Sequence, residues 1–405
     1  MTKIAVTGMG VVSPLGLTPD SMWDALLEGV NGIRCINRVD PKATPGVQIA
    51  AEVPEFDVTP YVRNRKLLKA MTRPGKYLVA ATHMALSDAG LLDPRVREGL
   101  STSVVVGLGS HTPEHYEMVP WEERPPLWYL ETFPNLTLSQ VSINFDLRDD
   151  FNVLLNACAS GTKALLDGAT QIRIGNADIA IVGAAESKIS QRHLAGFCRL
   201  GALSKSPDPD AACRPFDRGR DGFVMGEGAG ILILEEYERA KRRGAQIHAL
   251  ISGGGCSMDA GRLTDPDIEG RGLARAMQRA FKNAGVDASK VGYVNAHGTS
   301  TVANDKSESL AIRSAFGSHS EKLVVNSTKS MMGHATAASG AMEAIVCIKS
   351  LQHQKVHMTR NFESGCEVCS LDYVPNAARD VRLRYAMSNS AGLGGLNSSV
   401  IFAAA

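Results

Sequence analysis

The chain has 405 residues, of which 44% are hydrophobic and 21% charged, as is typical of a globular protein. The charges of its 43 basic and 42 acidic residues nearly cancel, which argues against a nucleic-acid partner. No apolar run reaches the roughly 18 residues of a membrane span, which argues against a membrane partner. The eight cysteines are too irregularly spaced for a disulfide framework and the N-terminus lacks a signal-peptide pattern, so we expect a cytoplasmic protein with reduced thiols.

Short apolar runs alternate with longer helical patterns along the chain. The runs that we expect to be strands are, in chain order, KIAVTGMG (3–10), SVVVGLGS (103–110), DIAIVGAAE (178–186), GILILEE (230–236), YVNAHG (293–298) and LVVNSTK (323–329). The patterns that we expect to be helices are GKYLVAATHMALSDAG (75–90), GTKALLDGATQIRIG (161–175), GLARAMQRAFKNAG (272–285) and SGAMEAIVCIKSLQ (339–352). Strands that alternate with helices predict an α/β protein built in layers.

Two segments of the first part of the chain resemble two segments of the second part. LVAATHMALSDAG (78–90) is similar to LARAMQRAFKNAG (273–285), and CASGTKALLDGATQI (158–172) is similar to AASGAMEAIVCIKSL (337–351). The long interval between the copies indicates a duplicated half rather than a solenoid repeat. We therefore predict two halves, residues 1–250 and residues 251–405.

The stretch VLLNACASGTKALLDG (153–168) places a lone cysteine, Cys158, between an apolar run and a helical pattern. At the start of a helix, unpaired amides and the helix dipole would lower the pKa of this thiol and favour a thiolate nucleophile. A cysteine buried in a core is more often a small inert hydrophobic residue. This stretch alone supports the two interpretations about equally.

Two histidines stand where a predicted strand gives way to a polar loop. They are His297 in YVNAHGTSTVAND and His334 in NSTKSMMGHATAASG, both in the half that duplicates the cysteine-bearing half. A single loop histidine is more often a surface residue. If the halves pack about a pseudo-twofold axis, however, their strand ends converge, and two neutral imidazoles that donate to one oxygen would stabilise an enolate or oxyanion.

Charged residues accompany both histidines. Lys329 precedes His334 in the sequence, and Asp305 and Glu308 follow His297. Solvated loop charges are one interpretation; a buried set that orients the histidines and keeps them neutral is the other. The glycines of SNSAGLGGLNSS, near the C-terminus, would allow backbone amides to approach a ligand closely.

Cys366 and Cys369 form a single CxxC sequence. A structural zinc site needs two further ligands at a matching spacing, and none stands nearby. The flanking sequences do not indicate a thioredoxin-like setting either. We therefore predict that both cysteines have a packing role.

Taken together, these motifs resemble those of the elongating β-ketoacyl-acyl-carrier-protein synthases of the thiolase-like superfamily. The motifs NACASG, VNAHGTST, NSTKSMMGH and SNSAGLGG occur in family order, supported by RPFDRGRDGFVMGEGAG, and the resemblance covers essentially the whole chain. It implies a five-layered α-β-α-β-α fold built from two duplicated halves. It also implies decarboxylative Claisen condensation of a malonyl group, carried by an acyl carrier protein, with an acyl chain held on a cysteine.

The resemblance assigns a role to each motif. Cys158 would be the acyl-carrying nucleophile, and His297 and His334 would bind the malonyl carbonyl and stabilise the enolate. Lys329 would position His334, with Glu308 and Asp305 in the same network. The amides of Cys158 and Leu393 would form an oxyanion hole, with Leu393 at the position of a gate. Thr299 and Thr301 would hold the phosphopantetheine arm, which the acyl carrier protein supplies, so we expect no cofactor of the enzyme's own.

Two further sites follow from the resemblance. One is a monovalent-cation site, for which the matching positions are Asn295, Glu343, Ser388 and Asn389. The other is a basic docking patch for the acidic carrier protein, comprising Arg63, Arg65, Lys66, Lys69, Arg73 and Lys76, together with Lys205. A solvated helix face is the alternative interpretation of this patch.

The chain departs from the family pattern in two places. Family members that act on straight fatty chains have aromatic residues in a pattern NSFGFGG, where this chain has Ala391 and Leu393, which enlarges the mouth of the pocket. The segment His111–Asn135 is also atypical and carries two of the three tryptophans, so it is expected either to line the acyl pocket or dimer interface or to be a surface insertion.

These departures favour the ketosynthase subunit of a type II polyketide pathway, polyene or aromatic, paired with a chain-length-factor subunit. The alternative is a housekeeping fatty-acid elongation enzyme that works as a homodimer. A third hypothesis, a non-catalytic chain-length-factor scaffold, conflicts with the presence of Cys158, His297 and His334.

Overall fold

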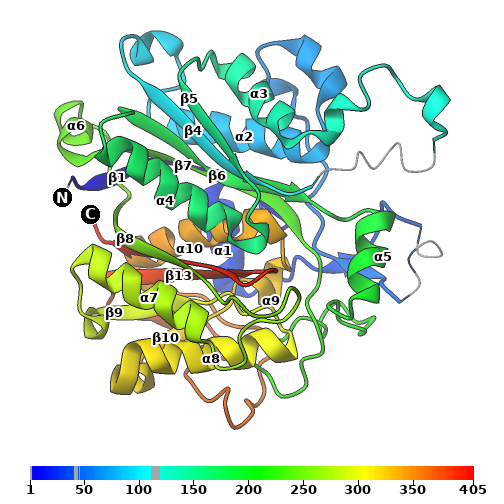
Figure 1. Cartoon of the computed structure of the whole chain (residues 1–405), viewed down its shortest axis with the longest axis vertical. Helices are drawn as coiled ribbons and strands as arrows, with labels where there is room; N and C mark the ends of the chain where they lie inside the picture. Colours follow the sequence, from blue (N-terminus) through cyan, green and yellow to red (C-terminus); the bar gives the residue numbers. More distant parts are fainter. Residues whose placement is uncertain (1, 41–43, 45, 111–118) are drawn as a thin grey trace.

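Ten strands form one continuous sheet in the computed structural model, which describes residues 2–40, 44, 46–110 and 119–405 (Figure 1). The first five strands of the sheet order are β10 (Val324–Asn326), β9 (Val291–Asn295), β13 (Tyr385–Gly392), β14 (Leu396–Ala403) and β8 (Ala249–Met258). The other five are β1 (Ile4–Val12), β7 (Glu227–Glu236), β6 (Ile179–Ser187), β4 (Thr102–Leu108) and β5 (Asp150–Leu154). The first group comes from the C-terminal part of the chain and the second from the N-terminal part.

The two groups of strands have the same internal arrangement. Within each group the outer three strands run parallel to one another, and each of the inner two runs antiparallel to its neighbours. The two groups meet at β1 and β8, which pair through three residue pairs, Ile4–Val6 against Ala249–Ile251. All nine residues of β6 are buried. A strand that is covered on both faces needs apolar residues at nearly every position. This explains why IAIVGAA is apolar throughout and does not alternate between apolar and polar residues.

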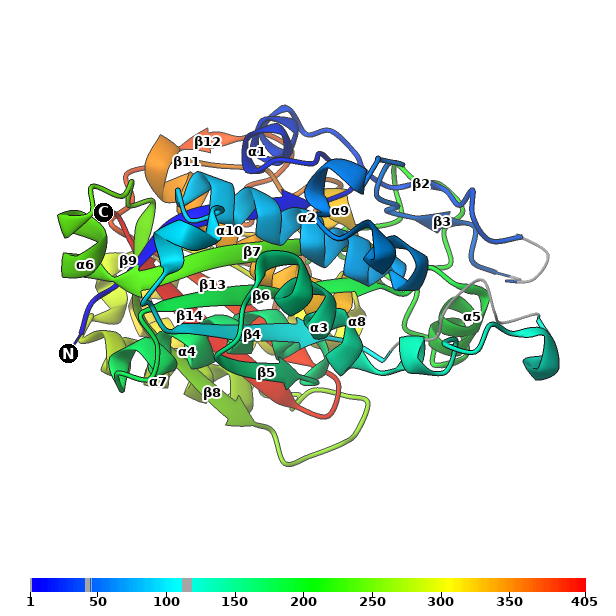
Figure 2. The same ribbon diagram turned by 90° about the horizontal axis from the view of Figure 1, so that it is seen from above.

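Helices form three layers around the two groups of strands (Figures 1 and 2). The outer layer on the N-terminal strands holds α2 (Arg73–Asp88) and α3 (Pro134–Phe145), the middle layer holds α4 (Ser160–Arg173) and α10 (Ser339–His353), and the other outer layer holds α7 (Arg271–Ala284) and α8 (Val302–Phe316). The remaining helices are α1 (Pro19–Glu28), α5 (Gln191–Arg199), α6 (Tyr237–Arg242) and α9 (Lys329–Met332). The order of layers is α-β-α-β-α, which confirms the predicted fold.

In the part of the chain that the structure describes, four short strands lie outside the main sheet. The small strands are β2 (Arg34–Cys35), β3 (Ile49–Ala50), β11 (Lys355–Val356) and β12 (Arg379–Asp380), which form two antiparallel pairs. Figure 2 shows the pair β2–β3 and helix α5 together at the end of the molecule opposite the two termini. Within the described ranges, no helix is long and apolar enough to cross a membrane.

Helices α4 and α10 cross in the middle layer at two glycines. A Cβ on Gly161 would lie 2.8 Å from the Ala341 nitrogen, and one on Gly340 would lie 2.3 Å from the Thr162 Oγ1. These are equivalent positions of the repeated sequences, CASG and AASG. Glycine permits the close approach, so the duplicated segments contact each other reciprocally.

The residues just before the two helices also correspond. Ala157 and Thr336 both adopt a left-handed conformation, with φ of 49° and 40°, which is uncommon for residues other than glycine. Each begins a short 3-10 turn that leads into its helix, Ala157–Ala159 before α4 and Thr336–Ala338 before α10. In the second copy the place of Cys158 is taken by Ala337. Only one of the two equivalent turns therefore carries a thiol.

Candidate active site

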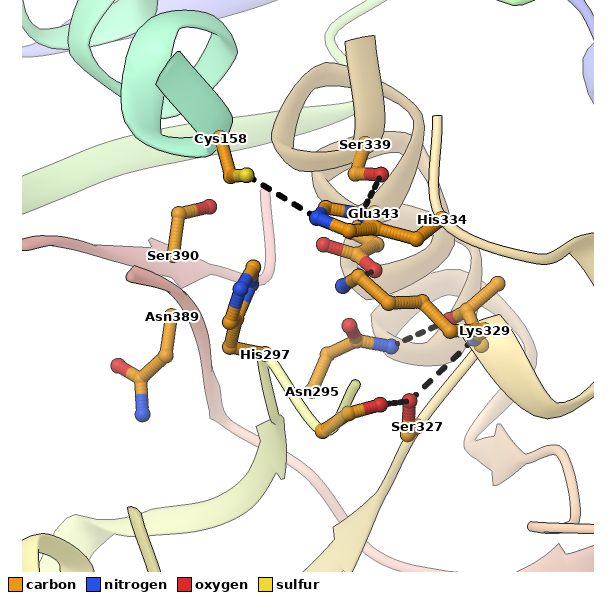
Figure 3. Close-up of polar contacts among 12 residues, drawn as sticks. Cys158, Asn295, His297, Ser327, Lys329, His334, Ser339, Glu343, Asn389 and Ser390 are labelled. Carbon is orange, nitrogen blue, oxygen red and sulfur yellow. Dashed lines mark hydrogen bonds and ion pairs between the residues drawn. The ribbon is translucent and has the colours of Figure 1, made fainter. Parts of the chain in front are cut away.

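The predicted catalytic residues lie around one cavity of about 540 Å³, a size suited to a small ligand or an extended arm. Its lining includes Cys158, His297 and His334, together with Thr299 and Leu393. They come from the carboxyl ends of β5, β9 and β10 and from the loop between β13 and β14, where the parallel strands of the two halves converge. Figure 3 shows the thiol and the two imidazoles directed toward one another.

Cys158 occupies the 3-10 turn before α4 and is 7% exposed. The sharp turn after β5 is fixed by Ser160, whose Oγ accepts a hydrogen bond from the Asn156 amide (2.8 Å) and donates one to the Ala157 carbonyl (2.7 Å). The position at a helix start was predicted correctly.

Of the two interpretations of this thiol, its burial opposes the one in which the helix start lowers the pKa. Burial raises the pKa of Cys158, and this outweighs the positive charges of Lys188 and Lys329 and the backbone amide of Leu393, which lower it. Because burial removes the thiolate from water, the helix N-terminus alone does not produce one. Burial therefore favours the thiol form of Cys158, which gives a neighbouring base the role of taking its proton.

His334 provides a nitrogen at the required distance. Its Nε2 lies 3.0 Å from the Cys158 Sγ, and its Nδ1 lies 3.0 Å from the Ser339 Oγ. Burial lowers the pKa of His334 well below its usual value, and the charges of Lys329 and Lys188 lower it further. A neutral imidazole carries one N–H and one lone pair, so His334 can either accept the thiol proton or donate to a substrate oxygen.

His297 stands at right angles to His334, with ring centroids 5.2 Å apart. Burial lowers the pKa of His297 well below its usual value, with Lys329 and His334 as the further causes. Its backbone amide donates to the Glu308 Oε1 (2.8 Å), and its buried Nδ1 has no partner among the described residues. Two neutral imidazoles therefore face one space beside the thiol.

Among the residues that the structure describes, no hydrogen bond joins Lys329 to His334, so the positioning role that the family resemblance implies stays a prediction. Its ammonium group pairs with the Glu343 Oε1 at 2.5 Å, and both side chains are 1% exposed. The hydrogen bond that orients the His334 ring comes instead from Ser339, which the sequence analysis missed. Lys329 acts on both histidines through its charge, which disfavours imidazolium.

Glu308 and Asp305 hold backbone rather than imidazole rings. The Glu308 carboxylate accepts from the amides of His297 and Gly298, both at 2.8 Å. The Asp305 carboxylate accepts from the amides of Phe216 (2.7 Å) and Ser300 (3.2 Å). Burial raises the pKa of Glu308 to about 7 and also raises that of Asp305. Both carboxylates are buried and fix the backbone of the loop that carries His297, and an action of either on the imidazole rings stays a prediction.

The cavity mouth carries the predicted hydroxyls and amides. The Oγ1 atoms of Thr299 and Thr301 are 2.9 Å apart, and both residues line the cavity. The Leu393 amide is among the groups that lower the pKa of Cys158, and a Cβ on Gly392 would lie 3.2 Å from the Cys158 nitrogen. The amides of Cys158 and Leu393 are thus close neighbours. The Leu393 side chain is 43% exposed at this mouth.

The set matched to a monovalent cation contains unpaired oxygens. Asn295 Oδ1, Glu343 Oε2 and Ser388 Oγ are buried without a hydrogen-bond partner among the described residues, and Ser388 lies opposite Asn295 in the sheet. The fourth member, Asn389, accepts from the Ser399 Oγ (2.8 Å). Buried polar oxygens are normally satisfied, so three orphaned ones fit a small hard cation.

The predicted docking patch is mostly exposed. Five of its members lie exposed around the 3-10 helix Arg65–Ala70 and the start of α2: Arg63, Arg65, Lys66, Lys69 and Lys76. Lys205 is also exposed, and its amide bonds to Asp221, which lines the cavity. Arg73 departs from the prediction, because it is half-buried and its Nη1 bonds to the Tyr77 hydroxyl (3.4 Å). Arg199, exposed at the cavity, was not predicted.

The atypical segment His111–Asn135 lies only partly within the described residues, since 111–118 fall outside them. Residues 119–135 form short 3-10 turns with several exposed apolar side chains, among them Trp121 and Tyr129. None of residues 119–135 lines the cavity around Cys158.

Comparison with known proteins gives the same assignment along the whole chain. Residues 1–240 match the family model described as beta-ketoacyl synthase, N-terminal domain, and residues 248–363 match the C-terminal domain of the same family. The 3-oxoacyl-[acyl-carrier-protein] synthase 2 of Staphylococcus aureus (strain COL) is 39% identical over 407 residues, which cover 99% of this chain and 98% of the relative.

Two solved structures are similar throughout. The ishigamide ketosynthase/chain length factor superposes with a TM-score of 0.91 at 33% identity, covering 100% of this chain and 99% of the other. A type II PKS acyl-carrier protein in complex with its ketosynthase bound to the hexaketide gives a TM-score of 0.89 at 30% identity, with the same coverage.

Proposed function

The chain belongs to the β-ketoacyl synthase family and is a ketosynthase, and on that premise we propose which of its residues carry each step of a decarboxylative condensation. The observation that carries this proposal is the contact between His334 Nε2 and Cys158 Sγ at 3.0 Å, with a second neutral imidazole, His297, beside it.

The first step loads the acyl chain onto Cys158. His334 accepts the thiol proton as the sulfur attacks the carbonyl carbon of an acyl thioester, and the amides of Cys158 and Leu393 stabilise the oxyanion. The thioester bond to the carrier then breaks, and the departing pantetheine sulfur takes the proton from His334. Both the thiol of Cys158 and the free imidazole of His334 are needed for this transfer.

The second step forms the new carbon–carbon bond. The malonyl thioester oxygen receives hydrogen bonds from His297 and His334, and the bond to the malonyl carboxylate breaks to release carbon dioxide. The two N–H groups stabilise the resulting enolate, whose carbon attacks the acyl thioester and expels the Cys158 thiolate, which takes up a proton from solvent to restore the thiol. Neutral imidazoles suit this task, because the low pKa of each ring keeps it uncharged near neutral pH.

No redox or metal centre takes part in these steps, and the phosphopantetheine arm comes with the carrier protein, so we propose that the enzyme has no catalytic cofactor. Asn295, Glu343 and Ser388 would hold a monovalent cation, which would satisfy their three unpaired buried oxygens. Thr299 and Thr301 would bind the arm at the cavity mouth.

We further propose that the partner is an acidic acyl carrier protein docked on the exposed basic patch. A related type II PKS ketosynthase is seen in complex with an acyl-carrier protein, which supports this partner. Lys66 and Lys69 project from the 3-10 helix Arg65–Ala70 into solvent, so their charges can attract an acidic protein at a distance.

A second protein chain is proposed to cover the free edge of β5. This strand is the last of the sheet order, and Phe151 on it is 68% exposed, with Leu155 just beyond it 60% exposed. An exposed apolar edge strand is a template for pairing with another strand. A chain-length-factor subunit is the favoured occupant, since a similar structure contains a ketosynthase and a chain length factor, and a second copy of this chain is the alternative.

The pathway proposed is a type II polyketide pathway, polyene or aromatic. Ala391 and Leu393 replace rings at the pocket mouth, and two structural relatives belong to ketosynthases with a chain length factor or a polyketide ligand. The alternative is fatty-acid elongation, which the 39% identity to 3-oxoacyl-[acyl-carrier-protein] synthase 2 favours.

The experiment that tests the assigned roles is release of carbon dioxide from malonyl-carrier protein. We expect His297→Ala and His334→Ala each to slow it by at least about 100-fold, as removal of an oxyanion donor does. Ser339→Ala should slow it about tenfold or less, because it frees the ring of His334 without removing it. An unchanged rate in either histidine variant would exclude that histidine from the enolate site.

A further inference from the structure

The CxxC sequence at Cys366 and Cys369 does not have the surroundings of two packing cysteines. Cys366 is partly exposed, whereas Cys369 is fully buried. The two lie in a tight turn between β11 and β12, so tight that a Cβ on Gly365 would lie 1.8 Å from the Cys369 carbonyl oxygen. The turn therefore brings the two thiols side by side, one facing water and one facing the core.

The sulfur of Cys366 accepts a backbone hydrogen bond within the turn. The Cys369 amide donates to it at 3.4 Å, and the Val368 amide and the Cys369 side chain act on it as further causes that lower its pKa. Partial burial raises the pKa of Cys366, but these groups, with the charge of Arg220, outweigh it and lower the pKa to about 7. This lower pKa favours the thiolate, which is the reactive form.

The sulfur of Cys369 has the opposite surroundings. Burial raises its pKa to about 12, although the Ser309 hydroxyl, 3.6 Å away, and the charge of Arg220 lower it. It also lies 3.7 Å from the Asp305 carbonyl. Such a thiol is protected from reagents in solution and can react only with a group attached next to it.

We propose that Cys366 and Cys369 form a dithiol site for exchange with low-molecular-weight disulfides, in which Cys366 attacks and Cys369 resolves. A partly exposed sulfur that accepts a backbone hydrogen bond, beside a buried sulfur in a tight CxxC turn, is the arrangement that this chemistry requires. The condensation uses neither thiol, so the site is independent of the proposed function.

The exchange balances in two steps. The Cys366 thiolate attacks one sulfur of a disulfide such as glutathione disulfide, forms a mixed disulfide and expels the other half as a thiolate. The Cys369 thiol then loses its proton, attacks the Cys366 sulfur and expels the second glutathione thiolate, which takes up a proton. Two protein thiols are thereby oxidised to one disulfide, and one glutathione disulfide is reduced to two thiols.

The test incubates the full chain with glutathione disulfide at neutral pH, followed by acid quenching, alkylation and peptide mass spectrometry. In the unmodified chain we expect the peptide that holds both cysteines to lose two hydrogen atoms and to retain no glutathione. In Cys369→Ser, glutathione should remain on Cys366, because the resolving thiol is gone. In Cys366→Ser, Cys369 should stay reduced.

The exposed Cys35, on β2, is the internal reference for glutathione reactivity. Free thiols at both Cys366 and Cys369 while Cys35 is modified would overturn the proposal. Glutathione that persists on Cys366 in the unmodified chain would also overturn it, because Cys369 would then not act as the resolving thiol. Both serine variants are nearly isosteric, and circular dichroism shows whether they fold.

Discussion

At the scale of single residues, the site depends on keeping two imidazoles and one thiol uncharged. Each of the three is buried, and burial disfavours the ionised form: it lowers the pKa of His297 and His334 and raises the pKa of Cys158. Lys329 adds to the effect on the histidines, while its own charge is balanced by Glu343 at 2.5 Å. The ion pair therefore shapes the site electrostatically without contacting the reacting atoms.

This arrangement predicts how decarboxylation depends on pH. An imidazole whose pKa is depressed stays neutral as the pH falls through the usual value of 6.5 and is protonated only at lower pH. We expect the rate of carbon dioxide release from malonyl-carrier protein to stay flat between about pH 8 and pH 6. The measurement is the pH–rate profile of the unmodified enzyme.

Glu308 provides the control for that profile, because its pKa lies at about 7 and its protonation falls in the same window. Glu308→Gln removes this titration and keeps an oxygen that accepts from the His297 amide. A loss of rate centred near pH 6.5 in both the unmodified enzyme and Glu308→Gln would show that the histidines titrate normally, which would contradict the account.

The sequence predicted the identities of the reacting residues better than their partners. Cys158, His297 and His334 each stand in a motif, and the structure brings them together. The bond from Ser339 to His334 and the pairing of Lys329 with Glu343 depend on how α9 and α10 pack. The degree of burial, which decides the direction of the Cys158 pKa, is likewise a property of the packed molecule.

At the scale of elements, the crossing of α4 and α10 places the thiol opposite His334. Gly161, three residues after Cys158, approaches the backbone of α10, and Gly340 approaches α4 in return. Any side chain at this crossing would push the two helices apart. The distance between the Cys158 sulfur and the His334 ring is therefore coupled to these two glycines.

Gly161→Ala tests this coupling. Its Cβ would lie 2.8 Å from the Ala341 nitrogen and 2.9 Å from the Ala337 carbonyl oxygen, both backbone atoms, so the helices must shift. We expect the free energy of unfolding to fall by about 1–3 kcal/mol, as overpacking typically costs, and acylation of Cys158 to slow at least about tenfold. Chemical denaturation and the acylation rate are the measurements.

Gly196→Ala, in α5, is the matched control, since a Cβ there would meet nothing within 4 Å. Alanine favours a helix over glycine by up to about 1 kcal/mol, so this variant should be neutral or slightly more stable. Equal stability and activity of Gly161→Ala and Gly196→Ala would refute the role of the crossing.

At the scale of the whole molecule, the duplication read from the sequence corresponds to the symmetric order of the strands and to the five layers. The two CASG-like segments became the two helices of the middle layer, with Cys158 in one turn and Ala337 in the other. The reciprocal glycine contact was not predicted, because a repeat shows that two segments are alike but not that they touch. Arg73 was misplaced for a similar reason: its basic character was evident, whereas its contact with Tyr77 was not.

Carrier-protein docking is a property of the molecular surface and is testable by charge. We expect Lys66→Glu/Lys69→Glu to raise the KM for carrier-bound substrates at least about tenfold at low salt, with less effect at high salt, because salt screens exposed charges. The KM for a small thioester that lacks the carrier protein should not change. Lys282→Glu/Lys290→Glu, at exposed positions at and just after the end of α7, is the control with the same change in charge. Equal effects of the two pairs would mean that net charge, not the patch, governs docking.

The most direct test of the central claim, that Cys158 carries the acyl chain of a ketosynthase, is intact-protein mass spectrometry after incubation with acyl-carrier thioesters. The panel holds saturated, polyunsaturated and aromatic acyl groups, and the purified chain is tested alone and with a chain-length-factor subunit. We predict a single acyl adduct that is located on Cys158 and is lost in Cys158→Ala. We expect it to form with unsaturated or aromatic acyl groups, or to form only when the second subunit is present. Loading by saturated chains alone would instead indicate fatty-acid elongation. An adduct that persists in Cys158→Ala, or no adduct with any donor in the presence of the second subunit, would contradict the account.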